Sequence, residues 1–145
     1  MRTISLWQPW AELIVRGLKR YETRSWEISY RGVIAIHAAK RKFRSEDMLR
    51  ESRQQLVVDE VDPFYLKYGC VLGFAEVVDC LPVEQVRDEV LDRELLYGNY
   101  DDGRFAWRFE RVIALPEPVA LSGHQGIFFW REGVEIYKRL KDRAA

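Results

Sequence analysis

Apolar and β-branched residues gather in short runs along this chain, and most runs have the length and alternation of strands. They predict six strands, over residues 2–6, 21–26, 32–38, 69–80, 105–115 and 126–130. Pro116 and Pro118 are expected to end the fifth strand, because proline cannot donate a ladder hydrogen bond. The run at 32–38 is almost continuously apolar, which is typical of a strand buried on both faces.

Between these strands, apolar residues recur at the three- and four-residue spacing of helices. Gln8, Pro9 and Trp10 open a helix that Gly17 is expected to end, since glycine tolerates the left-handed conformation after a last turn. Further helices are predicted over 46–55, capped by Ser45, from Pro82 to 96, and over 133–143. Strands outnumber helices, and the helices are inserted between them. The pattern therefore predicts an α+β fold, a small mixed barrel with helices around it.

Length and composition fit one folded domain. The chain has 145 residues, of which 48% are hydrophobic and 13% aromatic, so it can bury a core without disulfides. Cys70 and Cys80 lie in one predicted strand, too far apart to bridge, and no Cys/His cluster suggests zinc or another cofactor. No secretory h-region follows Met1 and no apolar run could span a membrane. These features favour a reducing, cytoplasmic setting.

The net charge of zero conceals an asymmetry. Residues 1–50 carry 11 basic and 5 acidic side chains, whereas residues 51–104 carry 5 basic and 13 acidic ones. The densest basic run, residues 40–44, lies in the positive third. Binding to phosphate requires positive charge only where the contact is made. The zero net charge therefore limits where a nucleic acid can bind and how strongly, but it does not exclude such binding.

Residues 17–24 carry the spacing GxKxxExR, through Gly17, Lys19, Glu22 and Arg24, and it resembles the signature of the ASCH domain family. Further likenesses lie in the Gln-Pro-Trp segment before the first helix and in residues 31–39, 73–77, 107 and 123–126. Together they span about residues 4–130 and look most similar to the transcription-cointegrator-type members. The resemblance implies a single ASCH domain over 1–145, folded as a PUA-like β-barrel, with a terminal helix over about 133–143.

The resemblance also implies a nucleic-acid-binding module, with RNA as the expected partner, and a cleft lined by the signature. Alternation places Glu22 and Arg24 on one strand face, where a guanidinium can donate to phosphate or to a base edge. Aromatic rings can stack on an unpaired base, amides can bind its edge, and lysines can contact phosphates. The residues expected to bind the ligand are Gln8, Trp10, Lys19, Glu22, Arg24, Trp26, Lys40, Lys42, His124 and Gln125.

Two other functions stay open. Some relatives of the family hydrolyse acetylcytidine and others have been proposed as ribonucleases, so Lys19 can also be a base or nucleophile, with Glu22 moving a proton. Those amidohydrolases have threonine where this chain has Glu22, and their distant catalytic glutamate has no clear equivalent; Glu76 and Glu84 are the alternatives. A nucleoside-like small molecule would then be the substrate. The third function is protein interaction through the acidic middle segment.

Several of these residues also have ordinary structural interpretations. Glu22 and Arg24 can form an ion pair that only stabilises the sheet, and tryptophans belong to a core more often than to a stacking surface. His37, at the end of an apolar strand, is expected to be a buried histidine with its hydrogen bonds satisfied. Ser122 and His124 lie close in sequence, but nothing indicates a residue that would orient the imidazole as in a catalytic triad.

Overall fold

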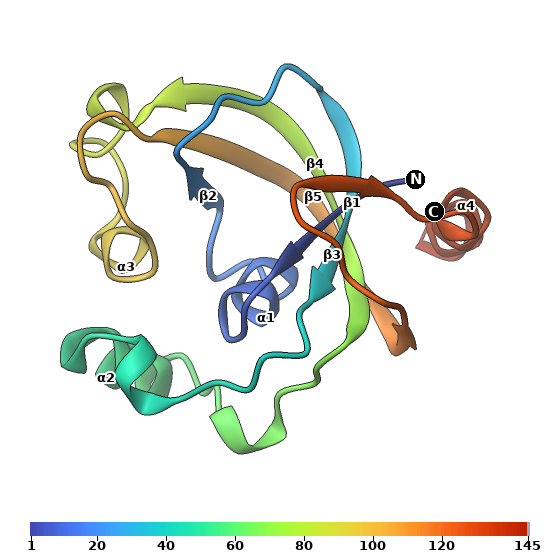
Figure 1. The fold of residues 1–145 in the computed structure, drawn as a ribbon, viewed down its shortest axis with the longest axis horizontal. Helices are drawn as coiled ribbons and strands as arrows, with labels where there is room; N and C mark the ends of the chain where they lie inside the picture. Colours follow the sequence, from blue (N-terminus) through green and yellow to red (C-terminus); the bar gives the residue numbers. More distant parts are fainter. Residues whose placement is uncertain (145) are drawn as a thin grey trace.

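The computed structural model describes residues 1–144, with side chains through Arg143 (Figure 1). Its strands are β1 (Arg2–Leu6), β2 (Tyr21–Arg24), β3 (Gly32–Ala38), β4 (Cys70–Pro82), β5 (Phe105–Ala120) and β6 (Ile127–Phe129). Its α-helices are α1 (Trp10–Val15), α2 (Arg50–Val58), α3 (Asp92–Leu96) and α4 (Gly133–Ala144). Three short 3-10 turns cover Ser45–Asp47, Pro63–Tyr65 and Val83–Gln85.

The six strands form one mixed sheet in the order β2-β5-β4-β3-β1-β6. β1 and β3 run parallel, and all other neighbours are antiparallel. Figure 1 shows the sheet curled into a half-barrel around α1. The predicted α+β fold is confirmed, and the barrel stays open because β2 and β6 lie at opposite edges of the sheet.

Irregular pairing explains how the two longest strands curl. The register between β4 and β5 shifts at three places, and β-bulges of this kind bend a strand and increase its twist. Gly73 lies at the first of these shifts, and a Cβ there would be 2.4 Å from the carbonyl oxygen of Ile113. The close approach of the two backbones at this bend therefore requires glycine.

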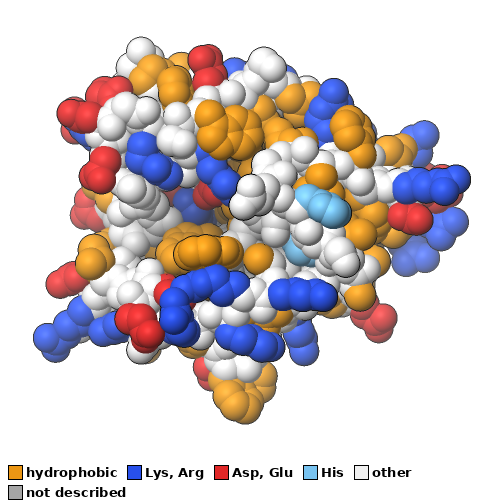
Figure 2. Space-filling model, in the orientation of Figure 1, with side chains coloured by type: hydrophobic (Ala, Val, Ile, Leu, Met, Phe, Trp, Pro, Cys, Tyr) orange, Lys and Arg blue, Asp and Glu red, His pale blue; other side chains and the backbone are white. Residues whose placement is uncertain are grey.

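Both faces of the curled sheet are covered. On the concave side, Ala11, Ile14 and Val15 of α1 pack into the main hydrophobic core with the inward side chains of the strands. On the convex side, α4 packs through Ile136 and Tyr137 against a cluster around Phe74 and Trp130. The concave side also receives α2 and α3 (Figure 1). Residues of these helices and of the sheet line a hollow on this side (Figure 2).

Two predicted helices are wrong in extent. Ser45 begins a 3-10 turn rather than capping a helix, because the Asp47 carboxylate accepts from the Arg44 amide at 2.9 Å and fixes the turn; α2 begins only at Arg50. Pro82 does not start a helix either. It is the last residue of β4 and pairs with Phe105, so the helical residues before 96 are reduced to a 3-10 turn and the short α3.

The fifth strand is longer than predicted, since β5 continues through Pro116 and Pro118 to Ala120. β2 pairs only with the first four residues of β5, up to Arg108. Beyond that point the outer edge of β5 pairs with no other strand among residues 1–144. On the β4 side, residues 115–118 lie where the register shifts between Ala114 and Val119. The two prolines therefore interrupt a ladder on neither edge, which is why they are tolerated.

Candidate functional site

A cleft of about 1070 Å³ opens on the concave side of the sheet. Its walls come from the end of β1, the start of α1, β2, the loop after β3, the start of α2, the end of α3 with the loop after it, and the loop at 123–126. Figure 2 shows this hollow near the centre of one face, with basic and acidic side chains inside it and basic side chains along one rim. Segments far apart in sequence therefore build one site.

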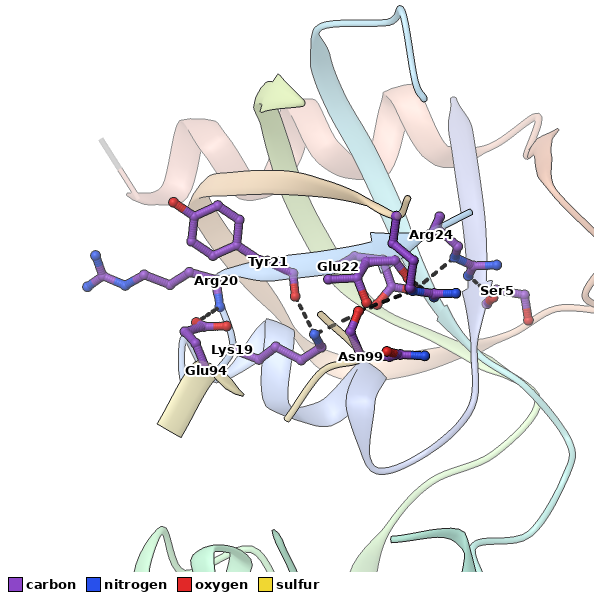
Figure 3. A network of polar contacts seen from close by, with 10 residues as sticks. Ser5, Lys19, Arg20, Tyr21, Glu22, Arg24, Glu94 and Asn99 are labelled. Carbon is purple, nitrogen blue, oxygen red and sulfur yellow. Dashed lines mark hydrogen bonds and ion pairs between the residues drawn. The ribbon is translucent and has the colours of Figure 1, made fainter. Parts of the chain in front are cut away.

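Lys19 lies at the base of the cleft, with a side chain only 1% exposed. Gly17, at φ +74°, ends α1, and the amide of Lys19 donates to the carbonyl of Leu13 at 3.1 Å. This turn directs the side chain inward, where its Nζ donates to the Tyr21 carbonyl and lies 3.8 Å from Glu22 Oε1 (Figure 3). Burial lowers the pKa of Lys19, because the charged ammonium loses its water.

Glu22 lies between two cations. Arg24 Nε donates to Glu22 Oε2 at 2.9 Å, and Arg24 Nη2 donates to the Ser5 carbonyl at 3.4 Å (Figure 3). The side chains are 11% exposed for Glu22 and 27% for Arg24, so the pair faces the cleft from a largely buried position. The predicted shared face is confirmed. One carboxylate between an ammonium and a guanidinium leaves the base of the cleft positive.

Glu94 is a buried residue beside this network that the sequence reasoning missed. Glu94 is 4% exposed and accepts a hydrogen bond from the Arg20 amide (Figure 3). Its Oε2 has no hydrogen-bond partner among the described residues. Burial raises the pKa of Glu94, although the nearby charge of Lys19 opposes that shift. In the sequence it is one glutamate of an acidic helix, so no pattern distinguishes it.

Glu76 and Glu84, the two candidates from the sequence for a distant catalytic glutamate, both have other partners. Glu76 forms an ion pair with the exposed Arg111, and Glu84 accepts from the Gly103 amide at 2.7 Å. Neither lines the cleft. Both are therefore removed from the catalytic alternatives.

An aromatic platform lies at the rim. Trp7 is 52% exposed and lines the cleft, and the Arg41 guanidinium lies 4.0 Å from the centroid of its ring. Arg41 is itself held by Asp47 through two hydrogen bonds of 2.7 and 2.8 Å. The sequence favours a core position for tryptophans in general. The exposure of Trp7 and its support by Arg41 make it instead a surface on which a planar ligand can stack.

Seven of the ten predicted binding residues line the cleft, namely Trp10, Lys19, Glu22, Arg24, Lys40, His124 and Gln125. The other three lie outside it. Gln8 is fully buried, and its amide donates to the Lys67 carbonyl at 2.8 Å and accepts from the Glu12 amide at 2.9 Å. Trp26 packs edge-on against Trp107, and Lys42 lies over the ring of Tyr68.

Three further residues behave as their patterns indicated. His37 is fully buried, with one ring nitrogen 2.9 Å from Ser5 Oγ and the other 2.6 Å from the Leu121 carbonyl oxygen. Cys70 and Cys80 are buried free thiols. Residues 1–144 contain no cluster of three or more His, Cys, Asp or Glu side chains suited to a metal ion, nor a helix long and apolar enough to cross a membrane.

Comparison with known proteins identifies the family. The ASCH domain matches residues 4–119, which include the signature and most of the curled sheet. The chain belongs to the ASCH domain family. It is 36% identical to human activating signal cointegrator 1 and 35% identical to the mouse protein, each over 92 residues. These matches cover 61% of the chain and 16% of either relative, so the chain corresponds to a small part of much longer proteins.

Solved structures agree on the fold. An ASCH protein from Zymomonas mobilis superposes with a TM-score of 0.59 at 19% sequence identity, covering 97% of this chain and 93% of that one. A mutant of the same protein superposes with a TM-score of 0.55 at 16% identity, covering 97% and 96%. This chain therefore shares its fold, the curled half-barrel sheet with helices, with these ASCH structures.

Proposed function

We propose that this ASCH domain binds nucleic acid, RNA in the first place, by holding one unpaired nucleotide in the cleft. The observation that carries the proposal is the ionic network at the base of the cleft, formed by Lys19, Glu22 and Arg24. A guanidinium and a carboxylate side by side present donors and acceptors to a base edge or a phosphate. The cleft volume of about 1070 Å³ leaves ample room for a nucleotide.

The charge of the cleft supports an anionic ligand. Although the chain is neutral, the charged lining residues are basic by four to two: Lys19, Arg24, Lys40 and Arg104 against Glu22 and Asp47. Asp47 is already paired with Arg41. The lining of the cleft therefore carries an excess of positive charge in a chain that is neutral as a whole, and such local charge favours salt-dependent binding of a phosphate backbone.

The aromatic side chains of the cleft support an unpaired base. Trp7 at the rim and Trp10 farther in both line the cleft. Stacking of a base on an aromatic ring contributes about 1–3 kcal/mol and tolerates any sequence. His124 and Gln125, on the loop opposite, are placed to contact the same ligand.

The direct test is binding of a fluorescent single-stranded oligoribonucleotide, followed by anisotropy. Arg24→Ala should weaken binding about 10- to 100-fold, because a charge-assisted hydrogen bond is lost. Lys19→Ala should weaken it as well. Lys138→Ala is the matched control, since Lys138 is exposed on α4, on the convex side. The proposal fails if Arg24→Ala binds within twofold of wild type while the fold is intact, or if the control weakens binding equally.

The salt dependence gives a second reading of the same titration. Lys40→Ala should lower the slope of log affinity against log salt by about one, without changing sequence preference, as expected of a phosphate contact. Lys42→Ala serves as the comparison, because Lys42 lies over Tyr68 outside the cleft lining. The same sequence made as DNA measures how far the 2′-hydroxyl contributes.

A hydrolase that acts on a modified nucleoside is the second candidate. It is favoured by one observation: burial lowers the pKa of Lys19, which brings the neutral amine, a base or nucleophile, closer to physiological pH. Glu22 and Glu94 are the carboxyl groups beside it. Turnover of acetylcytidine or cleavage of RNA that disappears in Lys19→Ala would support this function. No turnover across a panel of nucleosides and RNAs would remove it.

A further inference from the structure

Ser5 and His37 form a hydrogen-bonded pair in the wall of the cleft. They are direct neighbours across the parallel β1–β3 ladder, and Ser5 Oγ lies 2.9 Å from His37 Nδ1. The other ring nitrogen, Nε2, lies 2.6 Å from the carbonyl oxygen of Leu121. A hydroxyl, an imidazole and a fixed hydrogen-bond acceptor therefore follow one another in a line.

The acceptor decides which nitrogen of His37 carries the proton. A carbonyl oxygen can only accept, so Nε2 must donate to Leu121. In the neutral imidazole, Nδ1 then has a free lone pair, and the hydrogen bond with Ser5 must run from the hydroxyl to the ring. Burial also lowers the pKa of His37, so the neutral ring prevails at pH 7. This is the protonation state that a general base requires.

The pair faces the ligand space. Ser5 is partly exposed, and both residues line the cleft. Gly123 is placed against them: a Cβ there would be 2.8 Å from His37 Cε1 and 3.0 Å from Ser5 Oγ. The absence of a side chain at Gly123 leaves the imidazole and hydroxyl in contact without displacing either. Arg24, whose Nη2 donates to the Ser5 carbonyl, brings a positive charge next to the same residue.

We propose that Ser5 is an activated nucleophile with His37 as its base, and that the cleft accepts carboxylic esters of small acyl groups as substrates. The arrangement has the three roles of serine hydrolases: nucleophile, base, and a group that orients the base. Here the backbone carbonyl of Leu121 takes the orienting role. The proposal does not require nucleotide binding. It shares Arg24 with that function, but its nucleophile and base are Ser5 and His37 rather than Lys19 and Glu22.

The reaction balances with water as the only co-reactant. Ser5 Oγ attacks the ester carbonyl carbon while its proton passes to His37 Nδ1, and the Arg24 guanidinium is available to the oxyanion. Collapse breaks the carbon–oxygen bond to the alcohol, which leaves with the proton from Nδ1. Water then attacks the acyl-serine, gives a proton to Nδ1 and releases the carboxylic acid, and Ser5 regains its proton.

Covalent labelling with a fluorophosphonate tests the nucleophile directly. In this reaction a serine oxygen–phosphorus bond forms and fluoride leaves. Intact-mass measurement should show one added group, and peptide mapping should place it on Ser5. Ser5→Ala should abolish the label, whereas Ser122→Ala, a serine outside the cleft lining, should keep it. Hydrolysis of p-nitrophenyl acetate should fall at least about 100-fold in Ser5→Ala, because the base contributes about that much and acts only through this nucleophile.

His37→Gln tests the base, with the melting temperature measured alongside because His37 is buried. Loss of Ser5 labelling in a folded His37→Gln supports the proposal; should that variant unfold, labelling of wild type must fall as His37 becomes protonated at acidic pH. An unlabelled Ser5 in folded wild type, or labelling unchanged in His37→Gln or at acidic pH, overturns it. Oligonucleotide binding by Ser5→Ala reports separately on the nucleic-acid function.

Discussion

The network at the base of the cleft predicts how Glu22→Gln will change stability. Among the residues that the structure describes, Glu22 is the one carboxylate that contacts both Lys19 and Arg24, at 3.8 and 2.9 Å. The substitution keeps the shape of the side chain but removes its charge. Lys19, only 1% exposed, then has a buried ammonium without the carboxylate that forms an ion pair with it, and only Glu94, beyond ion-pair distance, remains nearby. Removing one partner of a buried ion pair is costly for this reason.

The magnitude follows from the two contacts. Two unit charges at the Lys19–Glu22 distance interact by about 4 kcal/mol at an effective dielectric constant of about 20. The hydrogen bond to Arg24 adds about 1.5–3 kcal/mol, and the desolvation of the carboxylate offsets part of both. We expect Glu22→Gln to lower the free energy of unfolding by about 2–4 kcal/mol. At about 3 °C per kcal/mol for a chain of this size, the melting temperature falls by about 6–12 °C.

A double-mutant cycle with Lys19→Met isolates the buried pair, measured by urea unfolding. Lys19→Met removes the ammonium and its desolvation cost together, so in that background Glu22→Gln should cost at least about 1 kcal/mol less than in wild type. Coupling of this size is typical of groups in contact. If the cost of Glu22→Gln is the same in both backgrounds within about 0.5 kcal/mol, Lys19 does not depend on Glu22 and the reasoning is refuted.

Three further predictions test neighbouring features. Burial raises the pKa of Glu94, so the folded state keeps this proton above pH 4.5, where the unfolded chain loses it. The stability of wild type relative to Glu94→Gln, measured by urea unfolding at a series of pH values, should therefore fall as the pH rises from 4.5 through the raised pKa. Trp7→Ala should weaken oligonucleotide binding about 5- to 100-fold in anisotropy, with unfolding free energy unchanged within about 0.5 kcal/mol. Gly123→Ala should lower stability by about 1–3 kcal/mol in thermal unfolding, because its methyl group would contact His37 and Ser5 too closely.

Each of these three predictions has an outcome that would contradict it. A stability difference for Glu94→Gln that is flat with pH would mean that the carboxyl group is not desolvated. Trp7→Ala with wild-type affinity would show that the rim platform does not stack on the ligand. Gly123→Ala with wild-type stability would show that the loop moves away from the Ser5–His37 pair at little cost.

The strands were predictable because their signal is local. Alternation and apolar runs placed β1, β3 and β6 within one or two residues, and Gly17 marked the end of α1. The errors arose where the structure of a segment depends on partners that lie far away in the sequence. β5 passes through two prolines because β2 does not reach that part of its outer edge and because the register against β4 shifts between Ala114 and Val119. No feature of residues 116–118 predicts the length or the register of another strand.

The same difference between local and distant partners explains which residues of the candidate site were predictable. Glu22 and Arg24 were placed together by strand alternation, which depends only on neighbouring residues. Gln8 was misplaced because its amide satisfies the helix start and the Lys67 carbonyl, and the second partner is 59 residues away. Glu94 and the Ser5–His37 pair were missed because the sheet brings their partners from other segments.

Nuclear magnetic resonance during titration with a single-stranded oligoribonucleotide tests the central claim most directly. The side-chain N–H signals of the tryptophans and of Arg24 report separately on the cleft and the rest of the molecule. We predict that the signals of Trp7, Trp10 and Arg24 shift together with one affinity, while that of Trp130, buried on the convex side, does not. Shifts confined to the convex side around α4, or no shift at Arg24 when the oligonucleotide is bound, would contradict the account.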